Sequence, residues 1–304
     1  MNLKTFKNLV KLTRARGPFG AATTVFRLAF PPKARNWPQC AELVRGRQGL
    51  EIGGPSSCFS RGFLPLYQEV AGLDNCNFSS ETIWEGTLRA GRNFHFYKGK
   101  PPGIQFVCEG SNMAPIGDAS YDFILSHHAL EHMANPIGAL KDWRRVLKPG
   151  GHVILIVPHK AMTFDHRRPV TTLEHLILDF QQGTREDDTT HMEEILRLHD
   201  PLLDWGADAR DQFEVRCRDN FRLRSMHHHV FTTGLVIQMF DYLGMQVLLA
   251  ESHVESNALV VARISSQADN RELLGAQAEW RRLSPFPVDR AVAGPVSSAR
   301  PSAS

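Results

Sequence analysis

Hydrophobic and polar positions follow two different periods along the middle of the chain. Between about residues 48 and 158, short apolar runs bounded by turn residues are interleaved with longer amphipathic stretches. Short apolar runs predict buried strands, whereas apolar residues at every third or fourth position predict helices. Strands that alternate with helices are typical of an α/β domain with a mostly parallel sheet.

One helix and five strands stand out in this region. The helix is expected over residues 136–147, where Ile137, Leu140 and Trp143 share one face. Gly and Pro break helices, so Lys148-Pro149-Gly150-Gly151 should end it. The strands are expected at residues 48–52, 67–74, 104–109, 121–126 and 152–157.

The pattern changes after the fifth strand. Residues 159–230 are polar, rich in His and Asp, and helical only over 172–181 and 190–198. A connection of this length is too long for a plain loop, so we expect a cap inserted after strand 5. The remaining regular elements are predicted as one helix and two strands, over 231–243, 245–250 and 257–264.

The two ends of the chain differ from its middle. Residues 1–47 hold ten basic residues against a single acid, although the whole chain carries a net charge of only +3. Within residues 3–16, apolar residues at helical spacing face lysines and arginines, which fits a surface helix, an interfacial helix on anionic lipid or a transit peptide. Residues 266–304 are expected to form a helix remnant and, after Arg282, a disordered tail.

Composition narrows the class of protein. The 304 residues are 42% hydrophobic and 22% charged, which is ordinary for a soluble globular chain. The five cysteines show no CxxC pairing, so they indicate reduced thiols in a reducing compartment. No apolar run approaches about 18 residues, and no signal-peptide pattern is present. We therefore expect a cytoplasmic protein, with peripheral contact at the inner membrane face through residues 3–16 as an option.

Three acids follow or end predicted strands, namely Glu51, Asp74 and Glu109. In an open α/β sheet, ligands bind outside the carboxyl ends of the strands, so these acids should line one crevice. The glycines Gly53 and Gly54 would let a ligand approach the backbone closely. Together these features predict a nucleoside site. A dinucleotide dehydrogenase fits less well, because the loop lacks the Gly-x-Gly-x-x-Gly spacing.

At this point the chain resembles the class I S-adenosylmethionine-dependent methyltransferases, and most closely their type 11 subgroup. The resemblance is carried by Leu50–Ser57, Gly72–Asn75, Cys108–Asn112, Ser120–His132 and Asn135–Pro158. It implies a Rossmann-like, seven-stranded, mostly parallel sheet with an antiparallel final strand. The methyltransferase domain would then span residues 48–265, with residues 159–230 as its helical cap.

The resemblance also implies where the cofactor S-adenosylmethionine binds. The family's glycine loop departs here, because Pro55 and Ser57 stand at two glycine positions, and Ser56 or Ser57 is expected to cap the next helix. The expected cofactor-binding residues are Glu51, Gly53, Gly54, Pro55, Asp74, Asn75, Glu109, Gly110, Ser111, Ser126 and His127.

A second motif lies beside this site. His128, Glu131 and His132 spell H-x-x-E-H, the inverted zinc-protease pattern. Its place inside the methyltransferase signature argues against proteolysis and favours structural hydrogen bonds by Glu131 and His132. A divalent metal that assists methyl transfer stays open as a cofactor, and no metal ligand is assigned.

The cap is expected to supply the catalytic groups. Thirteen of the 14 histidines lie after residue 126, and histidine is a natural proton acceptor near neutral pH. We expect the general base to be His166 paired with Asp165, or else His128. Arg167 and Arg168 could hold an anionic group of the acceptor. The alternative is a solvated cap whose charges pair with one another.

The sequence therefore predicts an S-adenosylmethionine-dependent methyltransferase that acts on an oxygen or nitrogen of a small-molecule, lipid-linked or glycan acceptor. Two alternatives remain: a non-catalytic module that binds the cofactor or a nucleoside, and a nucleic-acid methyltransferase that grips its substrate with the basic N-terminus. The latter usually carries an N/D-P-P-Y/F tetrapeptide after the fourth strand. Ser126-His127-His128 stands there instead, so nucleic acid is not the expected partner.

Overall fold

The fold is taken from a computed structural model that describes residues 32–204, 210–254 and 257–291. The expectations for residues 3–16 and for most of the basic N-terminal segment lie outside these residues. Among the described helices, none has the length and apolar character needed to cross a membrane.

The centre of the molecule is an eight-stranded sheet in the order β5-β6-β2-β1-β7-β8-β10-β9. Strands β6, β2, β1, β7 and β8 run parallel, and β10 is antiparallel to both of its neighbours. The strands are β1 (Gln48–Ile52), β2 (Gly72–Asn77), β5 (Gly91–Phe94), β6 (Gly103–Val107), β7 (Tyr121–His127), β8 (Leu147–Pro158), β9 (Met245–His253) and β10 (Asn257–Ile264). The Rossmann-like α/β architecture is confirmed.

The strand count is eight rather than the expected seven. The additional strand, β5, pairs antiparallel with β6 at the edge of the sheet. Its first three residues, Gly91, Arg92 and Asn93, are exposed, and only Phe94 is buried. A polar strand of this kind lacks the apolar alternation by which strands are predicted, so the sequence does not reveal it.

Both faces of the sheet are buried because successive side chains point to opposite sides. Along β8, Val153, Leu155 and Val157 pack in one core, which also contains the buried face of α4. Ile154 and Ile156 pack in the other core. The long apolar runs seen in the sequence are therefore fully buried strands of a three-layered domain.

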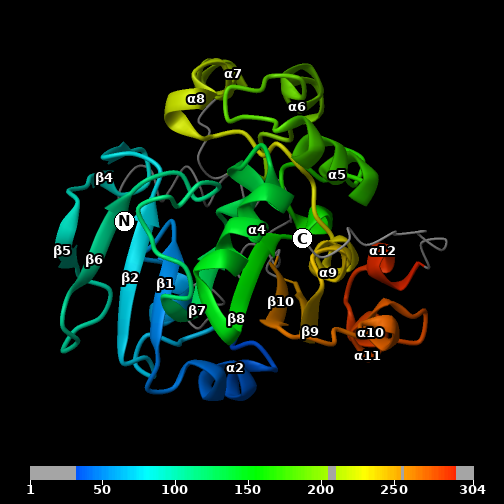
Figure 1. The fold of residues 1–304 in the computed structure, drawn as a ribbon. Helices are drawn as coiled ribbons and strands as arrows, with labels where there is room; N and C mark the ends of the chain where they lie inside the picture. The colour runs from blue at the N-terminus through cyan, green and yellow to red at the C-terminus, as the bar shows by residue number, and fades with distance from the viewer. Residues whose placement is uncertain (1–31, 205–209, 255–256, 292–304) are drawn as a thin grey trace.

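Helices cover the two faces of the sheet. α4 (Pro136–Val146) and α9 (Thr233–Tyr242) contribute to the first core, whereas α2 (Trp37–Val44) and α3 (Ser57–Ser60) contribute to the second. Figure 1 shows α4 crossing one face of the sheet and α2 at its lower end. A separate two-stranded hairpin consists of β3 (Glu81–Thr82) and β4 (Gly86–Thr87).

The second strand begins later than the sequence predicted. We expected it at residues 67–74, but β2 covers Gly72–Asn77. Tyr67 precedes the strand, is buried, and donates its hydroxyl to Glu51. The apolar residues before Gly72 are thus core residues of a turn, which apolar patterning alone cannot distinguish from a strand.

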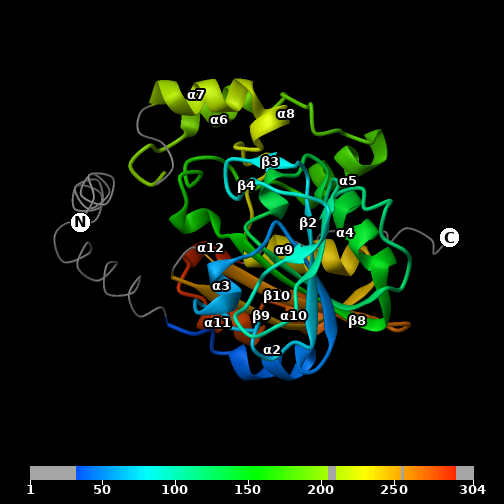
Figure 2. The same ribbon diagram turned by 90° about the vertical axis from the view of Figure 1, so that its left-hand side faces the viewer.

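Residues between β8 and α9 form the cap. Its helices gather at one end of the sheet, opposite α2 (Figures 1 and 2). They are the 3-10 turn η2 (Lys160–Met162), α5 (Leu173–Gln182), α6 (Met192–Leu198), α7 (Arg210–Arg218) and α8 (Asn220–Leu223). α5 begins at Thr172, whose side chain accepts from the His175 amide, and ends at Gly183 in the left-handed region.

The expectation of a disordered tail after Arg282 is wrong for residues 283–291, and for residues 292–304 it lies outside the described residues. The described residues after β10 form three short helices: α10 (Arg271–Leu274), α11 (Glu279–Leu283) and α12 (Pro287–Arg290). Phe286 and Asp289 are buried. The Asp289 carboxylate accepts from Ser252 and Ser284, and the Nε2 of His159 lies 3.2 Å from its Oδ1. One buried acid in a Pro-rich stretch therefore docks this segment on β8 and β9.

We expect Asp289→Asn to destabilise the fold. His159 Nε2 carries the ring proton because its Nδ1 accepts from the Ala161 amide, so an amide at position 289 would turn an N–H donor either on this ring or on the two serines. A buried donor then loses its acceptor at a cost of roughly 1–3 kcal/mol. Denaturant unfolding should show this loss of unfolding free energy. The matched control is Asp118→Asn, because the Asp118 side chain is 76% exposed in its ion pair with Arg145 and should change stability by less than about 1 kcal/mol. Equal effects of the two substitutions would contradict the docking role.

Candidate active site

The loop after β1 is shaped by two glycines. Gly53 has a φ of +78°, which favours glycine, and its amide donates to the Cys76 carbonyl. A Cβ on Gly54 would lie 2.2 Å from the Glu51 carboxyl carbon, so no side chain fits. The Asn75 amide grips the Gly54 backbone twice: its oxygen accepts from the Gly54 amide at 3.0 Å, and its nitrogen donates to the Gly54 carbonyl at 3.0 Å.

Glu51 supports this loop from behind. Its carboxylate is buried, and it accepts from the Tyr67 hydroxyl and, at 3.1 Å, from the Ser56 amide. Burial raises the pKa of Glu51 to about 8, despite these hydrogen bonds. Ser56 also caps α3 through the Cys58 amide, which confirms one of the two caps expected from the sequence.

A cavity of about 290 Å³ opens in front of the loop. It lies at the carboxyl ends of β1, β2, β6 and β7, where an open α/β sheet binds its ligands. The lining residues are Ile52, Gly53, Pro55, Ser56, Ser57, Cys76, Asn77, Phe78, Trp84, Glu85, Glu109, Gly110, His127, His128, Ala129, His132, Met133 and Arg224.

Of the eleven predicted cofactor-binding residues, fewer than half line this cavity. Five of them line it: Gly53, Pro55, Glu109, Gly110 and His127. Glu51, Gly54 and Asn75 lie behind the loop and shape it. The Ser111 hydroxyl donates to Glu186 in the cap, and the buried Ser126 hydroxyl has no hydrogen-bond partner among the described residues.

Of the three acids expected to line the crevice, only Glu109 does, so the expectation is wrong for Glu51 and for Asp74. Because β2 continues to Asn77, Asp74 lies three residues before the strand's carboxyl end. Its two oxygens accept from the Ile104 amide at 2.7 Å and the Tyr121 hydroxyl at 2.8 Å. Asn77 lines the cavity at the end of β2 instead, and its amide donates to the Gly54 carbonyl.

Glu109 meets a cation that the sequence did not single out. Arg224, which follows α8 in the cap, pairs with Glu109 and with Glu186, and it lines the same cavity. Burial raises the pKa of Glu109, and the neighbouring guanidinium opposes this shift. Arg224 lies more than 100 residues from Glu109 in the chain, so only the fold brings the two together.

His127, the last residue of β7, and His128 line the first cavity with two uncharged rings. The rings of His127 and His128 stack with centroids 4.1 Å apart. His127 Nδ1 lies 3.0 Å from the Ser56 hydroxyl, and His128 Nε2 lies 3.0 Å from the side-chain oxygen of Asn257. Burial lowers the pKa of His128 to about 4, so the ring is uncharged near neutral pH.

A second cavity of about 460 Å³ adjoins the first beneath the cap. Trp84, His128 and His132 line both cavities. Trp84 projects from the β3–β4 hairpin with just over half of its surface exposed. The remaining lining residues are Glu131, Pro158, Met162, Thr163, Phe164, Leu203, Asp204, Phe213, Arg216, Ser225 and His227.

The acid–histidine pair of the cap differs from the expected one. Asp165 pairs with His227, whose Nδ1 lies within hydrogen-bond reach of the Asp165 carboxylate. His166, the predicted partner of Asp165, instead lies 2.9 Å from Asp200. Burial lowers the pKa of His227, but Asp165 outweighs this effect and the net shift is upward. The run His227–His229 was visible in the sequence, but its partner acid 62 residues away was not.

The arginines after His166 also have other roles than expected. Arg167 pairs with Asp200. Arg168 is only 2% exposed and donates to Asp165 and to the carbonyls of His227 and His228. Its guanidinium therefore holds parts of the cap together and is not available to an anionic acceptor.

Within the described part of the chain, two groups of side chains bring metal-ligand atoms within 4.8 Å of one another. One consists of His175, Asp179, His191 and His229, and the other of Glu131, His132 and His227. His128 is in neither group, because its Nε2 faces Asn257. The H-x-x-E-H pattern therefore does not assemble as a zinc site.

The fold and the cavity at the carboxyl ends of its strands define a Rossmann-like domain with a nucleoside-sized site. Residues 50–155 match the profile of a family described as a methyltransferase domain. This part of the chain is thus a methyltransferase domain of the class I, S-adenosylmethionine-dependent type, as the resemblance implied.

Two curated relatives and two solved structures illustrate the similarity. The chain is 25% identical over 117 residues to a ubiquinone/menaquinone biosynthesis C-methyltransferase of Haemophilus ducreyi, which covers 38% of this chain and 43% of that protein. It is 28% identical over 126 residues to an uncharacterized 37.1 kDa transposon protein of Streptomyces fradiae, with coverage of 40% and 33%. The chain thus spans less than half the length of these relatives.

Both solved structures have low identity. A methyltransferase dependent on S-adenosylmethionine from Mesorhizobium loti is 14% identical, with a TM-score of 0.44 and coverage of 76% of this chain and 98% of that one. The methyltransferase CalH in complex with SAH, the demethylated cofactor, is 14% identical, with a TM-score of 0.41 and coverage of 75% and 54%.

The raised pKa of Glu51 predicts a pH-dependent stability. Between about pH 4.5 and pH 8, the folded protein keeps a proton that the unfolded chain releases. This stabilisation is complete below pH 4.5 and is lost as the pH rises, by at most about 1.4 kcal/mol per pH unit. Glu51→Gln should flatten this part of the unfolding free-energy profile. The control Glu42→Gln, on an exposed side chain, should keep the wild-type slope; identical slopes in all three proteins would refute the assignment.

Proposed function

We propose that the protein transfers a methyl group from S-adenosylmethionine to an oxygen or nitrogen nucleophile of an acceptor held in the second cavity. The observation that carries this proposal is the contact between the two cavities. Trp84, His128 and His132 line both, so a donor in one and an acceptor in the other would meet at these side chains.

The first cavity fits the cofactor in several respects. The loop at Gly53 and Gly54 presents backbone without side chains, which allows close approach of a ligand. Glu109 and Gly110 lie at the end of β6, where the family resemblance puts the adenine, and the Gly110 carbonyl is fixed by the Trp143 indole at 2.7 Å. At the end of β2, Asn77 lines the cavity in place of Asp74, which the resemblance had put among the cofactor-binding residues.

When bound, S-adenosylmethionine supplies a methyl group on a positively charged sulfonium. The residues of this chain would then exclude water and align the acceptor, which can supply much of the rate acceleration. The apolar side chains of Met162, Phe164 and Phe213 line the acceptor cavity and suit a carbon skeleton.

His227 would take the proton of the nucleophile. Its Nδ1 donates to Asp165, which leaves the Nε2 lone pair as the acceptor, and the ring lines the second cavity. Asp165 is held in turn by Arg168. A hydroxyl or amine acceptor on a small molecule or a glycan has such a proton to lose, which supports these acceptor classes. The sequence of residues 3–16 fits a helix that contacts anionic lipid, so the proposal also includes a lipid-linked acceptor.

A substitution of Asn75 tests the proposed binding of the cofactor in the first cavity. Because Asn75 holds both polar groups of the Gly54 backbone, Asn75→Ala should release the loop and weaken binding of SAH by about 10- to 100-fold in calorimetric titration. Asn93→Ala, at an exposed edge position, should bind SAH as the wild type does. Wild-type protein that takes up neither SAH nor S-adenosylmethionine would refute the proposal.

Substitutions of His227 and Asp165 test their proposed role in methyl transfer to the acceptor. His227→Gln and Asp165→Asn should each lower turnover by about 10²–10⁴-fold in an assay of SAH formation with hydroxyl and amine acceptor pools. Their SAH affinity should stay within about threefold, because neither residue lines the first cavity. His166→Gln, on the histidine that pairs with Asp200, should keep its turnover. Loss of turnover in His166→Gln alone would restore the pair expected from the sequence, and cofactor binding without turnover in any pool would indicate a non-catalytic module.

A further inference from the structure

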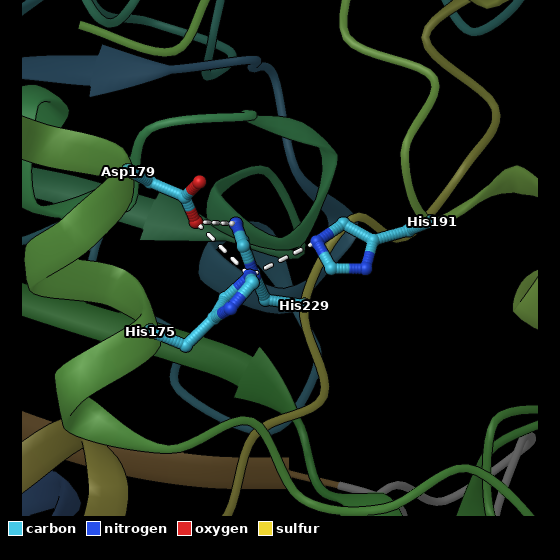
Figure 3. A group of neighbouring side chains, drawn as sticks. All are labelled: His175, Asp179, His191 and His229. Carbon is cyan, nitrogen blue, oxygen red and sulfur yellow. Dashed lines mark hydrogen bonds and ion pairs between the residues drawn. The ribbon is translucent and has the colours of Figure 1, made fainter. Parts of the chain in front are cut away.

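A cluster of three histidines and one aspartate lies in the cap, outside both cavities. It consists of His175, Asp179, His191 and His229, and Figure 3 shows the four side chains converging on one point. None of the four lines either cavity described above. Donor and acceptor binding in these cavities therefore do not account for the cluster.

The four residues come from three separate segments. His175 and Asp179 are one turn apart on α5, so they share a face of that helix. His191 lies immediately before α6. His229 belongs to residues 225–232, the segment that joins α8 to α9 and that we call the strap.

The distances between the ligand atoms suit a tetrahedral ion. His175 Nε2 lies 3.1 Å from His191 Nε2 and 3.3 Å from Asp179 Oδ2, and His229 Nε2 lies 3.6 Å from the same oxygen. Ligand atoms at about 2.0–2.1 Å from a tetrahedral ion lie about 3.3–3.4 Å from one another. The side chains thus stand close to the spacing that an ion would need.

The hydrogen bonding of Asp179 supports the same conclusion. Asp179 Oδ2 is buried and lacks a hydrogen-bond partner among the described residues. Its other oxygen accepts from the Thr184 hydroxyl at 3.0 Å, the kind of contact that orients a ligating carboxylate. His229 Nε2 lies 3.1 Å from the Ala134 carbonyl, so binding at this nitrogen would replace that contact.

We propose that His175, Asp179, His191 and His229 bind a divalent transition-metal ion, with Zn²⁺ as the best fit. Three imidazoles and a carboxylate are ligands that Zn²⁺ favours, and four protein ligands that leave no open position are typical of a structural site. The ion fastens α5 and the start of α6 to the strap. His227 lies on the same strap, two residues before His229, so the ion also holds the strap that carries the proposed base. Only this last consequence rests on the proposed function.

The test uses the full-length protein, stripped with a chelator and titrated with Zn²⁺ or Co²⁺. The wild type should bind one ion per chain at this site, should give the visible absorption of tetrahedral Co²⁺, and should melt at a higher temperature with metal than without. His175→Ala and His191→Ala should each weaken binding by about 100-fold or more and abolish the Co²⁺ spectrum. His95→Ala, which removes one exposed imidazole, should behave as the wild type.

Three outcomes would overturn the proposal. They are wild-type protein that binds no ion, ligand variants that bind as tightly as the wild type, and an ion that survives in His175→Ala but is lost in Glu131→Gln. The last result would assign the ion to Glu131, His132 and His227. Metal content, spectrum and melting temperature do not require methyl transfer, so failure of this proposal can be distinguished from failure of the proposed function.

Discussion

The buried guanidinium of Arg168 organises the functional end of the molecule. A buried cation is tolerated only when its donors are satisfied, and here they meet Asp165, Glu194 and the carbonyls of His227 and His228. These partners belong to three parts of the cap: the segment after β8, helix α6 and the strap. Because one side chain binds them all, the position of the strap and the orientation of Asp165 are coupled.

The turn that follows strand β7 of the sheet also contacts the strap. The His228 amide donates to the Glu131 carbonyl at 2.9 Å, and the Met226 carbonyl lies 3.0 Å from His132 Nδ1. Both contacts join the strap to the 3-10 turn η1 (Leu130–His132) that follows β7. The first cavity is built by the ends of parallel strands, and the second is built where the strap crosses those ends. The contact between the cavities thus follows from the chain path and not from any single residue.

Local signals in the sequence predicted the fold and the frame of the site. Gly53, Gly54, Glu109 and His127 lie where strand ends and glycine positions indicated, because the carboxyl ends of parallel strands converge whatever the details of the loops. The prediction for Asp74 was wrong because the apolar turn residues before Gly72 were included in the predicted strand, which therefore began and ended too early. A strand boundary depends on which backbone groups find partners across the sheet, and a single sequence does not record this.

Pairings within the cap were the least predictable part of the site. Asp165 and His166 are adjacent in sequence, yet each takes a partner from a different segment, His227 and Asp200. Neighbouring residues in a turn point in different directions, so adjacency gives no geometric reason for two side chains to pair. Arg224 joins Glu109 for the same reason that Asp165 joins His227: burial of charge requires the partner that the tertiary fold brings into reach.

The three successive histidines of the strap show how one short segment can serve several tasks. His227 turns to Asp165, His228 lies 3.2 Å from the Asn220 amide, and His229 turns to Asp179. Residues two apart in an extended segment normally point to the same side, yet His227 and His229 reach different partners, and Arg168 holds the carbonyls of His227 and His228 between them. The backbone between His227 and His229 is thus held at the His227 and His228 carbonyls. One short backbone segment therefore carries a residue of the histidine–aspartate cluster and a residue that lines the second cavity.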